Sequence, residues 1–254
     1  MTPLLVAFIF MFGTVIGSFL SAVLWRLHTG DSFVSGRSCC PHCRHTLAPA
    51  DLVPTLSYLA LGGRCRYCKH AIDASYILLE LVCGALFLAA AYVTLRESSV
   101  SPATLAKLLL NWYLLATFII VFMFDLRHMV ILRAVTLPAA VIAAVANVAL
   151  GASPLSIALG MLIGAGIFYV QYAVSKGRWV GGGDIHLGLL IGAALGFRNA
   201  VAAIFVAYIT GAVYAVYLLA TKKKQLQSQI PFGTFLSASA IVMLLFGDRI
   251  LAAL

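Results

Sequence analysis

Charged side chains are scarce in this sequence. Asp, Glu, Lys and Arg make up 10% of the 254 residues, whereas ordinary soluble domains carry roughly 25%. Hydrophobic residues make up 63%, and a soluble chain of this length would need far more polar surface to cover them. These proportions exclude a soluble globular protein and predict a polytopic membrane protein.

The familiar motifs of hydrolases are missing as well. The chain has no G-x-S-x-G nucleophile elbow, no H-E-x-x-H zinc motif and no serine with an evident base partner. Ser18 and Ser21 are small residues in an apolar run, where helix packing explains them. No basic segment precedes that run, which starts after Thr2 and continues to Trp25. Its length predicts a transmembrane helix and not a cleavable signal peptide.

Apolar runs of about 20 residues predict an all-α fold with about eight transmembrane helices. One sizeable polar segment lies between the first two runs, and we expect it to fold as a small insertion. The predicted division is a first transmembrane helix (1–25), a cysteine-containing loop (26–75) and a seven-helix membrane core (76–254). The predicted spans are 3–25, 76–95, 103–124, 131–150, 154–175, 185–197, 199–220 and 231–247.

The formal net charge of +9 follows from 17 Lys and Arg against 8 Asp and Glu. The basic residues lie in short loops without interleaved aromatics, which argues for contact with anionic membrane lipid and against nucleic acid. Segments 26–75, 125–133, 176–184 and 221–230 hold all of them except Arg96, Lys107, Arg198 and Arg249. The excess of positive charge predicts that these segments face the cytoplasm and that the N-terminus lies outside.

Two C-x2-C pairs, Cys40-Pro-His-Cys43 and Cys65-Arg-Tyr-Cys68, lie 21 residues apart in the predicted loop. This spacing predicts a closed, structural zinc site with Cys40, Cys43, Cys65 and Cys68 as ligands. Metal binding would supply much of the folding energy of so short a loop. Two disulfides are the alternative, which a cytoplasmic location disfavours. Cys39 is a spare thiol beside the site, and Cys83 is a thiol within the second span. His42, His45 and His70 are further possible ligands, although four cysteines already fill the shell. The sequence shows no convincing internal repeat.

Acidic residues inside apolar segments are costly, and by default they indicate function. Asp125 ends one apolar run, Asp184 follows Gly181-Gly182-Gly183, and Glu80 lies one turn into the second span. Each could be a solvated or paired carboxylate at a helix end. Brought together, Asp125 and Asp184 cannot both ionise easily, so one can act as a base while the other holds a proton. Such a pair can activate water against an amide and protonate the leaving nitrogen.

These motifs recur, in the same order, in a known family. They are Gly17-Ser-Phe-Leu20, Arg26, the two cysteine pairs, Asp51-Leu-Val-Pro54, Gly63-Arg-Cys65, Tyr76, Glu80, Phe124-Asp-Leu-Arg-His128, Gly181-Gly-Gly-Asp184 and Pro231-Phe-Gly233. Over nearly its whole length the chain resembles the type IV prepilin peptidases. These belong to the wider G-x-G-D group of intramembrane aspartyl proteases.

The resemblance implies a bacterial inner-membrane enzyme of type IV pilus or type II secretion systems. Such an enzyme cuts the leader of prepilins or pseudopilins after a glycine at the cytoplasmic face. Many members then methylate the new N-terminal amine with S-adenosylmethionine. Asp125 and Asp184 would be the catalytic residues and the cysteine loop the zinc site. Gly181, Gly182, Gly183, His186 and Glu80 would support them.

Two positions depart from the family pattern. Ile131-Leu132-Arg133 stands where Ile-Pro-Asp is usual, and His186 stands where a lysine is usual. His186 either influences Asp184, with its own titration near neutral pH, or is a plain polar helix-end residue. These changes leave open a catalytically altered protein that binds or assembles pilins. A metal-regulated transporter is less well supported, because transport sites usually lie at the bilayer midplane.

Overall fold

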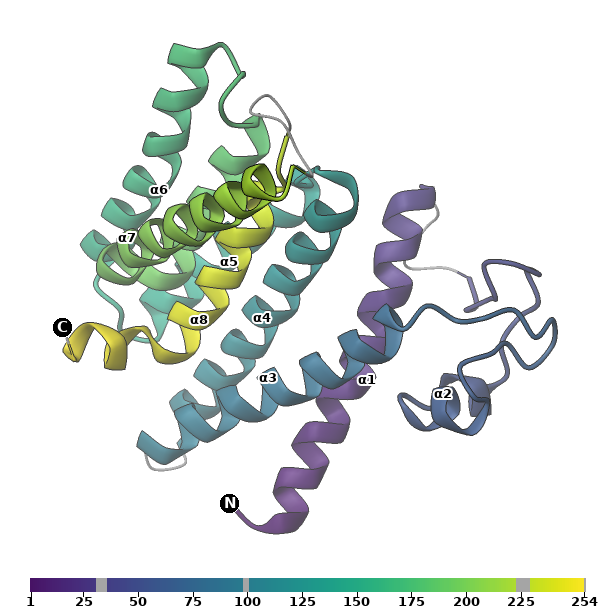
Figure 1. The fold of residues 1–254 in the computed structure, drawn as a ribbon. Coiled ribbons are helices and arrows are strands. Elements are labelled where there is room, and N and C mark those ends of the chain that lie inside the picture. The colour runs from purple at the N-terminus through teal and green to yellow at the C-terminus, as the bar shows by residue number, and fades with distance from the viewer. Residues whose placement is uncertain (31–35, 98–100, 223–228, 254) are drawn as a thin grey trace. The chain divides into compact units, whose positions relative to one another are not determined.

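The computed structural model describes residues 1–254 except 31–35, 98–100, 223–228 and 254 (Figure 1). The gaps include Lys223 and Lys224 of the predicted cytoplasmic loops. The described residues form helices and turns, with isolated β-bridges but no strand, which confirms the all-α prediction. The helices are α1 (Pro3–Thr29), η1 (Pro49–Leu52), α2 (Leu56–Ala60), α3 (Ser75–Glu97), α4 (Pro102–His128), α5 (Arg133–Ala149), α6 (Pro154–Ser175), α7 (Gly182–Ala220) and α8 (Phe232–Ala252).

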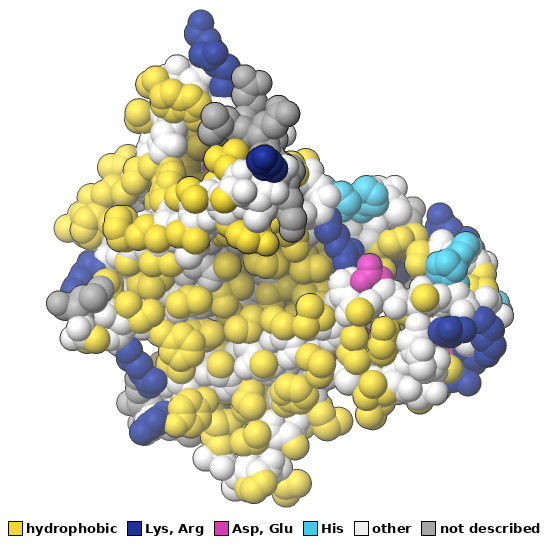
Figure 2. Space-filling view, in the orientation of Figure 1, with side chains coloured by type: hydrophobic (Ala, Val, Ile, Leu, Met, Phe, Trp, Pro, Cys, Tyr) yellow, Lys and Arg dark blue, Asp and Glu magenta, His cyan; other side chains and the backbone are white. Residues whose placement is uncertain are grey.

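Six of the described helices, α1, α3, α4, α6, α7 and α8, are long and apolar enough to cross a membrane. Figure 2 shows hydrophobic side chains over much of the face that it presents, as expected of a surface in lipid. The protein is therefore an integral membrane protein. The count of eight crossings stays a prediction, since α5 has 17 residues and α7 has 39.

Helix α7 is broken at Gly196. An unbroken helix of 39 residues would measure roughly 58 Å, about twice the hydrocarbon thickness of a bilayer. Gly196 adopts φ 70° and ψ −179°, a conformation that side chains disfavour, and a Cβ there would lie 2.9 Å from Ser156 Oγ. The Ser156 hydroxyl accepts a hydrogen bond from Phe197 N at 3.1 Å. The predicted boundary at 197–199 is thus close to the observed break.

A buried polar network holds the end of the first half of α7. Asn147 of α5 donates from Nδ2 to the carbonyls of Ala193 and Ala194, at 3.0 and 3.2 Å. Its Oδ1 accepts from Lys107 Nζ of α4 at 3.0 Å. Carbonyls at a helix end lack partners within the helix, and a cation there complements the helix dipole. This network explains how a helix can stop inside the apolar core.

The chain divides into two compact units, Met1–Glu97 and Ser98–Leu254. In the first unit α1 packs along α3, which the sequence division had grouped with the membrane core. The helices approach closely at glycines: a Cβ on Gly13 would lie 2.8 Å from Gly84 Cα, and one on Gly17 would lie 2.7 Å from Glu80 Cα. The small-residue spacing of the first span therefore serves helix packing, as predicted.

In the second unit, α7 contacts α5, α6 and α8, and α4 contacts α5 and α8. Glycines again set the closest approach, because a Cβ on Gly164 or Gly188 would collide with the backbone of the other. The fully buried side chains of this unit include Phe118, Phe168, Leu187, Leu190, Ile191 and Leu236. This packing fixes the ends of α4, α7 and α8 relative to one another, and the candidate site lies there.

Candidate active site and metal centre

Asp125 lies in the last turn of α4 and is 4% exposed. Its Oδ2 accepts hydrogen bonds from the backbone N–H and the hydroxyl of Thr234, at 2.7 and 3.1 Å. Thr234 belongs to the first turn of α8, where unpaired N–H groups and the helix dipole favour a negative charge. The α8 N-terminus therefore holds one oxygen of Asp125 in place.

Asp184 lies in the first turn of α7 and is 6% exposed. Its Oδ2 accepts a hydrogen bond from Gly181 N at 2.9 Å, and its own N–H donates to Gly181 O at 3.1 Å. This reciprocal arrangement closes the helix start and fixes the carboxylate. Gly181, Gly182 and Gly183 adopt no left-handed backbone conformation, so the glycines do not provide a special bend.

Small size is what the glycines provide. A Cβ on Gly183 would lie 2.8 Å from Ile131 Cβ, and a Cβ on Gly233 would lie 2.8 Å from Ile131 Cδ1. The side chain of Ile131 therefore touches the backbone just before Asp184 and the backbone that binds Asp125. An electrostatic interaction joins the two carboxylates. The structure thus brings together two buried acids from separate helices, at the same end of the unit.

Aromatic residues close one side of this region. Tyr208, in the second half of α7, interacts electrostatically with Asp184 and exchanges hydrogen bonds with Gln171 at 2.6 and 3.0 Å. Its ring centroid lies 5.0 Å from that of Phe232 and 6.3 Å from that of Phe168. Sequence reasoning did not single out Tyr208, Thr234 or Ile131 as site residues. Thr234 and Ile131 had nearby pointers, since Thr234 follows the Pro231-Phe-Gly233 motif and Ile131 begins the segment that departs from Ile-Pro-Asp.

The four predicted cysteine ligands form one cluster. Their sulfur atoms all lie within 4.8 Å of one another, and Cys40 Sγ lies 3.9 Å from Cys68 Sγ. Two thiolates on a tetrahedral zinc with Zn–S bonds of ~2.3 Å would be about 3.8 Å apart. All six cysteines are free, so the alternative of two disulfides is wrong. The donor set fits a metal ion that prefers four sulfur ligands.

Charge in the cluster also favours a cation. Burial opposes ionisation of Cys65, but the backbone N–H groups of Cys68 and Tyr67 outweigh it and lower the Cys65 pKa to about 7. The backbone N–H of His70 lowers the pKa of Cys68, yet burial and the neighbouring sulfurs raise it overall to about 11. Four thiolates therefore need a positive ion to be stable together.

The two cysteine pairs are copies of one local structure. Cys40 N donates to His45 O at 3.0 Å, and Cys65 N, 25 residues later, donates to His70 O at 2.9 Å. Rings from one copy contact rings from the other: His42 lies 3.7 Å from His70, and His45 lies 3.7 Å from Tyr67. The expectation of no internal repeat is therefore wrong. The shared pattern C-x2-C, then a basic residue and His, could have indicated the repeat.

Asp51 lies between the two copies in the sequence and is bound to the second copy. Asp51 accepts hydrogen bonds from Arg66 Nε at 2.6 Å and from the Tyr67 hydroxyl at 3.1 Å. The Arg66 hydrogen bond is the largest cause of a lowered pKa for Asp51. The stabilisation from the ionised Asp51 is therefore fully present above the ordinary carboxyl pKa of 3.8. It is lost as the pH falls through the lowered pKa of Asp51.

Comparison with known proteins gives a consistent result. Residues 11–94 match the model of the bacterial peptidase A24 N-terminal domain, and residues 112–216 match that of the type IV leader peptidase family. A prepilin leader peptidase/N-methyltransferase of Bacillus subtilis is 33% identical over 98% of this chain and 97% of its own. The chain belongs to the type IV leader peptidase family. The predicted resemblance is confirmed.

Other relatives of the same name agree. One from Aeromonas salmonicida is 31% identical over 95% of this chain and 91% of its own, and one from Pseudomonas aeruginosa is 30% identical over 94% and 90%. No solved structure matches. The first family match lies inside the unit that carries the cysteines, and the second contains Asp125 and Asp184. In this leader peptidase the four-cysteine cluster and the two acids thus belong to different units.

Glu80 lies in the first unit and is buried in α3. Its Oε2 accepts hydrogen bonds from Thr55 N at 2.6 Å and Thr55 Oγ1 at 3.3 Å. Thr55 has φ 61° and ψ −48°, which a β-branched residue rarely adopts. Glu80 therefore stabilises an unfavourable backbone conformation in the cysteine loop of this leader peptidase.

His186 is half-buried in the first turns of α7. It interacts electrostatically with Arg133 at the start of α5. No hydrogen bond joins it to Asp184 among the residues that the structure describes. Arg133 also reaches the α7 start, since a Cβ on Gly182 would lie 3.8 Å from its Nη2. The two departures from the family pattern, far apart in sequence, therefore lie near each other.

Gly233 offers a sharp test of the site. A Cβ there would lie 3.0 Å from both Asp125 Cγ and Asp125 Oδ2, so Gly233→Ala must displace the carboxylate by a few tenths of an ångström. We expect leader cleavage to fall at least tenfold, because misplacement by ~1 Å can cost about a hundredfold. The control is Gly166→Ala, where a Cβ meets nothing within 4 Å. Equal rates for both variants, measured on prepilin in membranes, would contradict the assigned position of Asp125.

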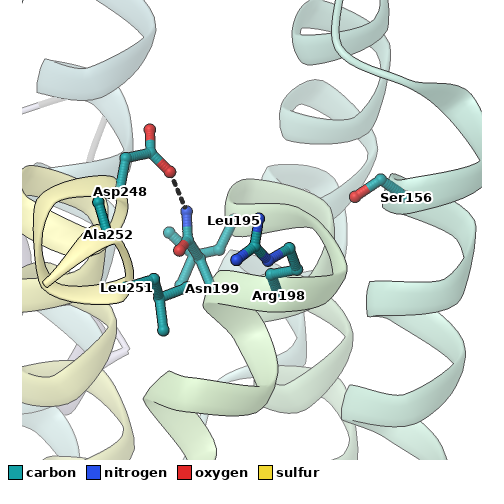
Figure 3. Close-up of a pocket in the computed structure, with 7 residues that line it drawn as sticks. All are labelled: Ser156, Leu195, Arg198, Asn199, Asp248, Leu251 and Ala252. Atoms are coloured by element: carbon teal, nitrogen blue, oxygen red, sulfur yellow. Dashed lines mark hydrogen bonds between the residues drawn. The ribbon is translucent and has the colours of Figure 1, made fainter. Parts of the chain in front are cut away.

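A polar hollow of about 350 Å³ lies at the other end of this unit, beside the α7 break and the end of α8 (Figure 3). Asn199 Nδ2 donates to Asp248 Oδ1 at 2.9 Å on its wall. None of the predicted site residues lines it; the lining residues are Ser156, Leu195, Arg198, Asn199, Asp248, Leu251 and Ala252. The hollow is therefore separate from both aspartates.

Proposed function

We propose that this protein cleaves the leader peptides of type IV prepilins or pseudopilins, with Asp125 and Asp184 as its catalytic residues. One observation carries the proposal: two buried carboxylates, from helices distant in sequence, interact at one end of the unit. Relatives of this chain are named for leader peptidase activity. We place the protein in the bacterial inner membrane, with its N-terminus outside and the aspartates at the cytoplasmic face.

The reaction needs a base and an acid in turn. The ionised carboxylate takes a proton from water as the water oxygen attacks the carbonyl carbon of the glycine that ends the leader. The protonated carboxyl gives its proton to the amide nitrogen as the C–N bond breaks. The leader leaves with a new carboxylate and the pilin with a new amine. Thr234 and Gly181 keep the acids oriented throughout by their hydrogen bonds.

The second activity in the relatives' names acts on the product of the first. Cleavage exposes the amine that N-methylation modifies, so methylation depends on prior leader removal. S-adenosylmethionine supplies the methyl group when bound. The described residues contain no strand and hence no nucleotide-binding sheet, and no residue is assigned to this cofactor.

We propose zinc as the metal of the cysteine cluster, at about one ion per chain. Four thiolates in tetrahedral spacing form a closed shell, which is typical of structural sites. A structural role agrees with its position in the first unit, while both acids lie in the second. Zinc would therefore stabilise the cysteine loop without taking part in cleavage.

The proposed activity can be tested with one mass measurement. Prepilin is co-expressed with the protein, and its mass reports both leader loss and an added methyl group. Prepilin that is bound by the protein but keeps its leader would instead support the catalytically altered pilin-binding alternative. That alternative rests on Arg133 and His186, the two departures beside the site.

The charges at these two positions are expected to be coupled. In His186→Lys a permanent cation faces Arg133, so we expect cleavage to fall several-fold by like-charge repulsion at the α7 start. The double variant with Arg133→Asp restores the family's pairing and should recover most of the rate. Initial rates of all four proteins form a double-mutant cycle. The control combines His186→Lys with Arg198→Asp, beside the break in α7, and equal rescue by that change would refute the coupling.

A further inference from the structure

The cysteine module, residues 36–75, carries an exposed apolar surface. Leu52, Val53, Leu56 and Leu59 are 42%, 42%, 64% and 63% exposed. Leu56 and Leu59 are three residues apart and share one side of α2, while Leu52 and Val53 lie at the end of η1, before the turn at Thr55. Four exposed aliphatic side chains in a module otherwise rich in charge need an explanation.

The other side of α2 faces the module itself. The Tyr58 hydroxyl donates to Ile72 O at 3.4 Å, and a Cβ on Gly63 would lie 3.0 Å from the same hydroxyl. Tyr58 thus packs the helix onto the segment that leads into α3. Leu56 and Leu59 are therefore exposed while Tyr58 of the same short helix packs on the module.

The attachment of α2 sets its depth. Thr55, immediately before the helix, is hydrogen-bonded to Glu80, which lies about 8 Å along α3 from its first residue. The same part of α3 exposes Leu78, Leu81 and Val82, by 61%, 38% and 40%, as a lipid-facing helix does. Figure 1 accordingly shows α2 alongside the α1–α3 pair and not beyond the end of α1. The apolar side of α2 therefore lies at the same depth as the lipid-facing residues of α3.

The charge of the module suits the same partner. Its described part, 36–75, exposes Arg37, Arg44, Arg64, Arg66 and Lys69 and contains two acids, Asp51 and Asp73. One of these acids is already paired with Arg66. Basic residues around an apolar helix face are typical of segments that lie in the interface of anionic bilayers.

We propose that the exposed side chains of Leu56 and Leu59 on α2, together with Leu52 and Val53 at the end of η1, insert into the lipid interface of the bilayer. The cysteine module is then docked on the membrane and held there by two attachments, the Thr55–Glu80 hydrogen bonds and the inserted leucines. Metal binding shapes the module, and the membrane positions it. A second copy of the chain and the helix of a pilin substrate are the other possible occupants of this surface.

Photocrosslinking separates these occupants. The full-length, zinc-loaded protein carries p-benzoylphenylalanine at position 56 or 59, and is reconstituted in vesicles of phosphatidylethanolamine and phosphatidylglycerol. We expect lipid adducts at both positions, in yield comparable to that at position 78 on α3, and none at position 37 on the basic side of the module. Mass spectrometry of the digested protein identifies the adducts. The metal content of each variant shows that the module has folded.

The other outcomes overturn the proposal. Dimer crosslinks at position 56 would assign the surface to a second copy. Crosslinks to added prepilin with loss of lipid adducts would assign it to the substrate. Absence of any adduct, with zinc retained, would show that the surface is hydrated. Leu56→Glu with Leu59→Glu gives a second measurement: zinc should be retained, but a protease added outside the vesicle should cut near residue 56 faster than in the wild type.

Discussion

Replacing either aspartate with asparagine is expected to abolish leader cleavage while the protein stays folded. An amide cannot take a proton from water or give one to the leaving nitrogen, and general acid–base catalysis contributes about 10²–10⁴-fold for each group. In Asp125→Asn the amide oxygen of the new side chain could still accept from Thr234, so the helix ends should keep their packing. Asp184→Asn should likewise keep the Gly181 contact. The measurement is the time course of leader loss from prepilin in membranes.

The matched control is Asp248→Asn. Asp248 lies on α8 and, like the other two aspartates, accepts a hydrogen bond from an amide N–H, but it borders the hollow at the far end of the unit. Its variant should cleave at the wild-type rate. Full cleavage by Asp125→Asn or Asp184→Asn would remove the proposed mechanism. Loss in all three would indicate a general effect of acidic residues on the fold.

Local patterns predicted the parts of this protein that depend on local chemistry. Apolar length predicted the long helices, because a bilayer demands a fixed run of nonpolar residues. The spacing of Cys40, Cys43, Cys65 and Cys68 predicted the cluster, because tetrahedral coordination restricts ligand spacing. The rarity of acids in apolar segments singled out Asp125 and Asp184. Each of these inferences used a cost that a single segment must meet by itself.

Contacts between helices could not be predicted in the same way. Thr234 binds Asp125 across 109 residues of sequence, and Ile131 fits between two helix starts only because Gly183 and Gly233 both lack a side chain. Glycines lie close to both acids in the sequence, and three glycines in a row ordinarily suggest a flexible bend. The structure assigns them close approach instead. Such roles depend on which backbones come into contact, and the periodicity of hydrophobic residues does not predict those contacts.

Removing two metal ligands is expected to unfold the cysteine module and leave the second unit intact. Cys40→Ser with Cys65→Ser deletes the two buried sulfurs of the cluster. Structural zinc contributes about 10–16 kcal/mol of binding energy in small domains, more than so small a module can replace by packing. Zinc should fall from about one ion per chain to none. Proteolysis should then cut within 36–74, while the unit from Ser98 onward stays resistant.

Cys39→Ser is the control for this experiment, because Cys39 is adjacent in sequence but lies outside the four-sulfur cluster. It should keep its zinc and its protease resistance. Metal retained by the double variant, or lost equally from Cys39→Ser, would contradict the assigned ligands.

The double variant also separates the two units functionally. If zinc only shapes the module, the residual cleavage of short soluble leader peptides should exceed that of membrane-embedded prepilin, because Asp125 and Asp184 keep all their hydrogen-bond partners in the second unit.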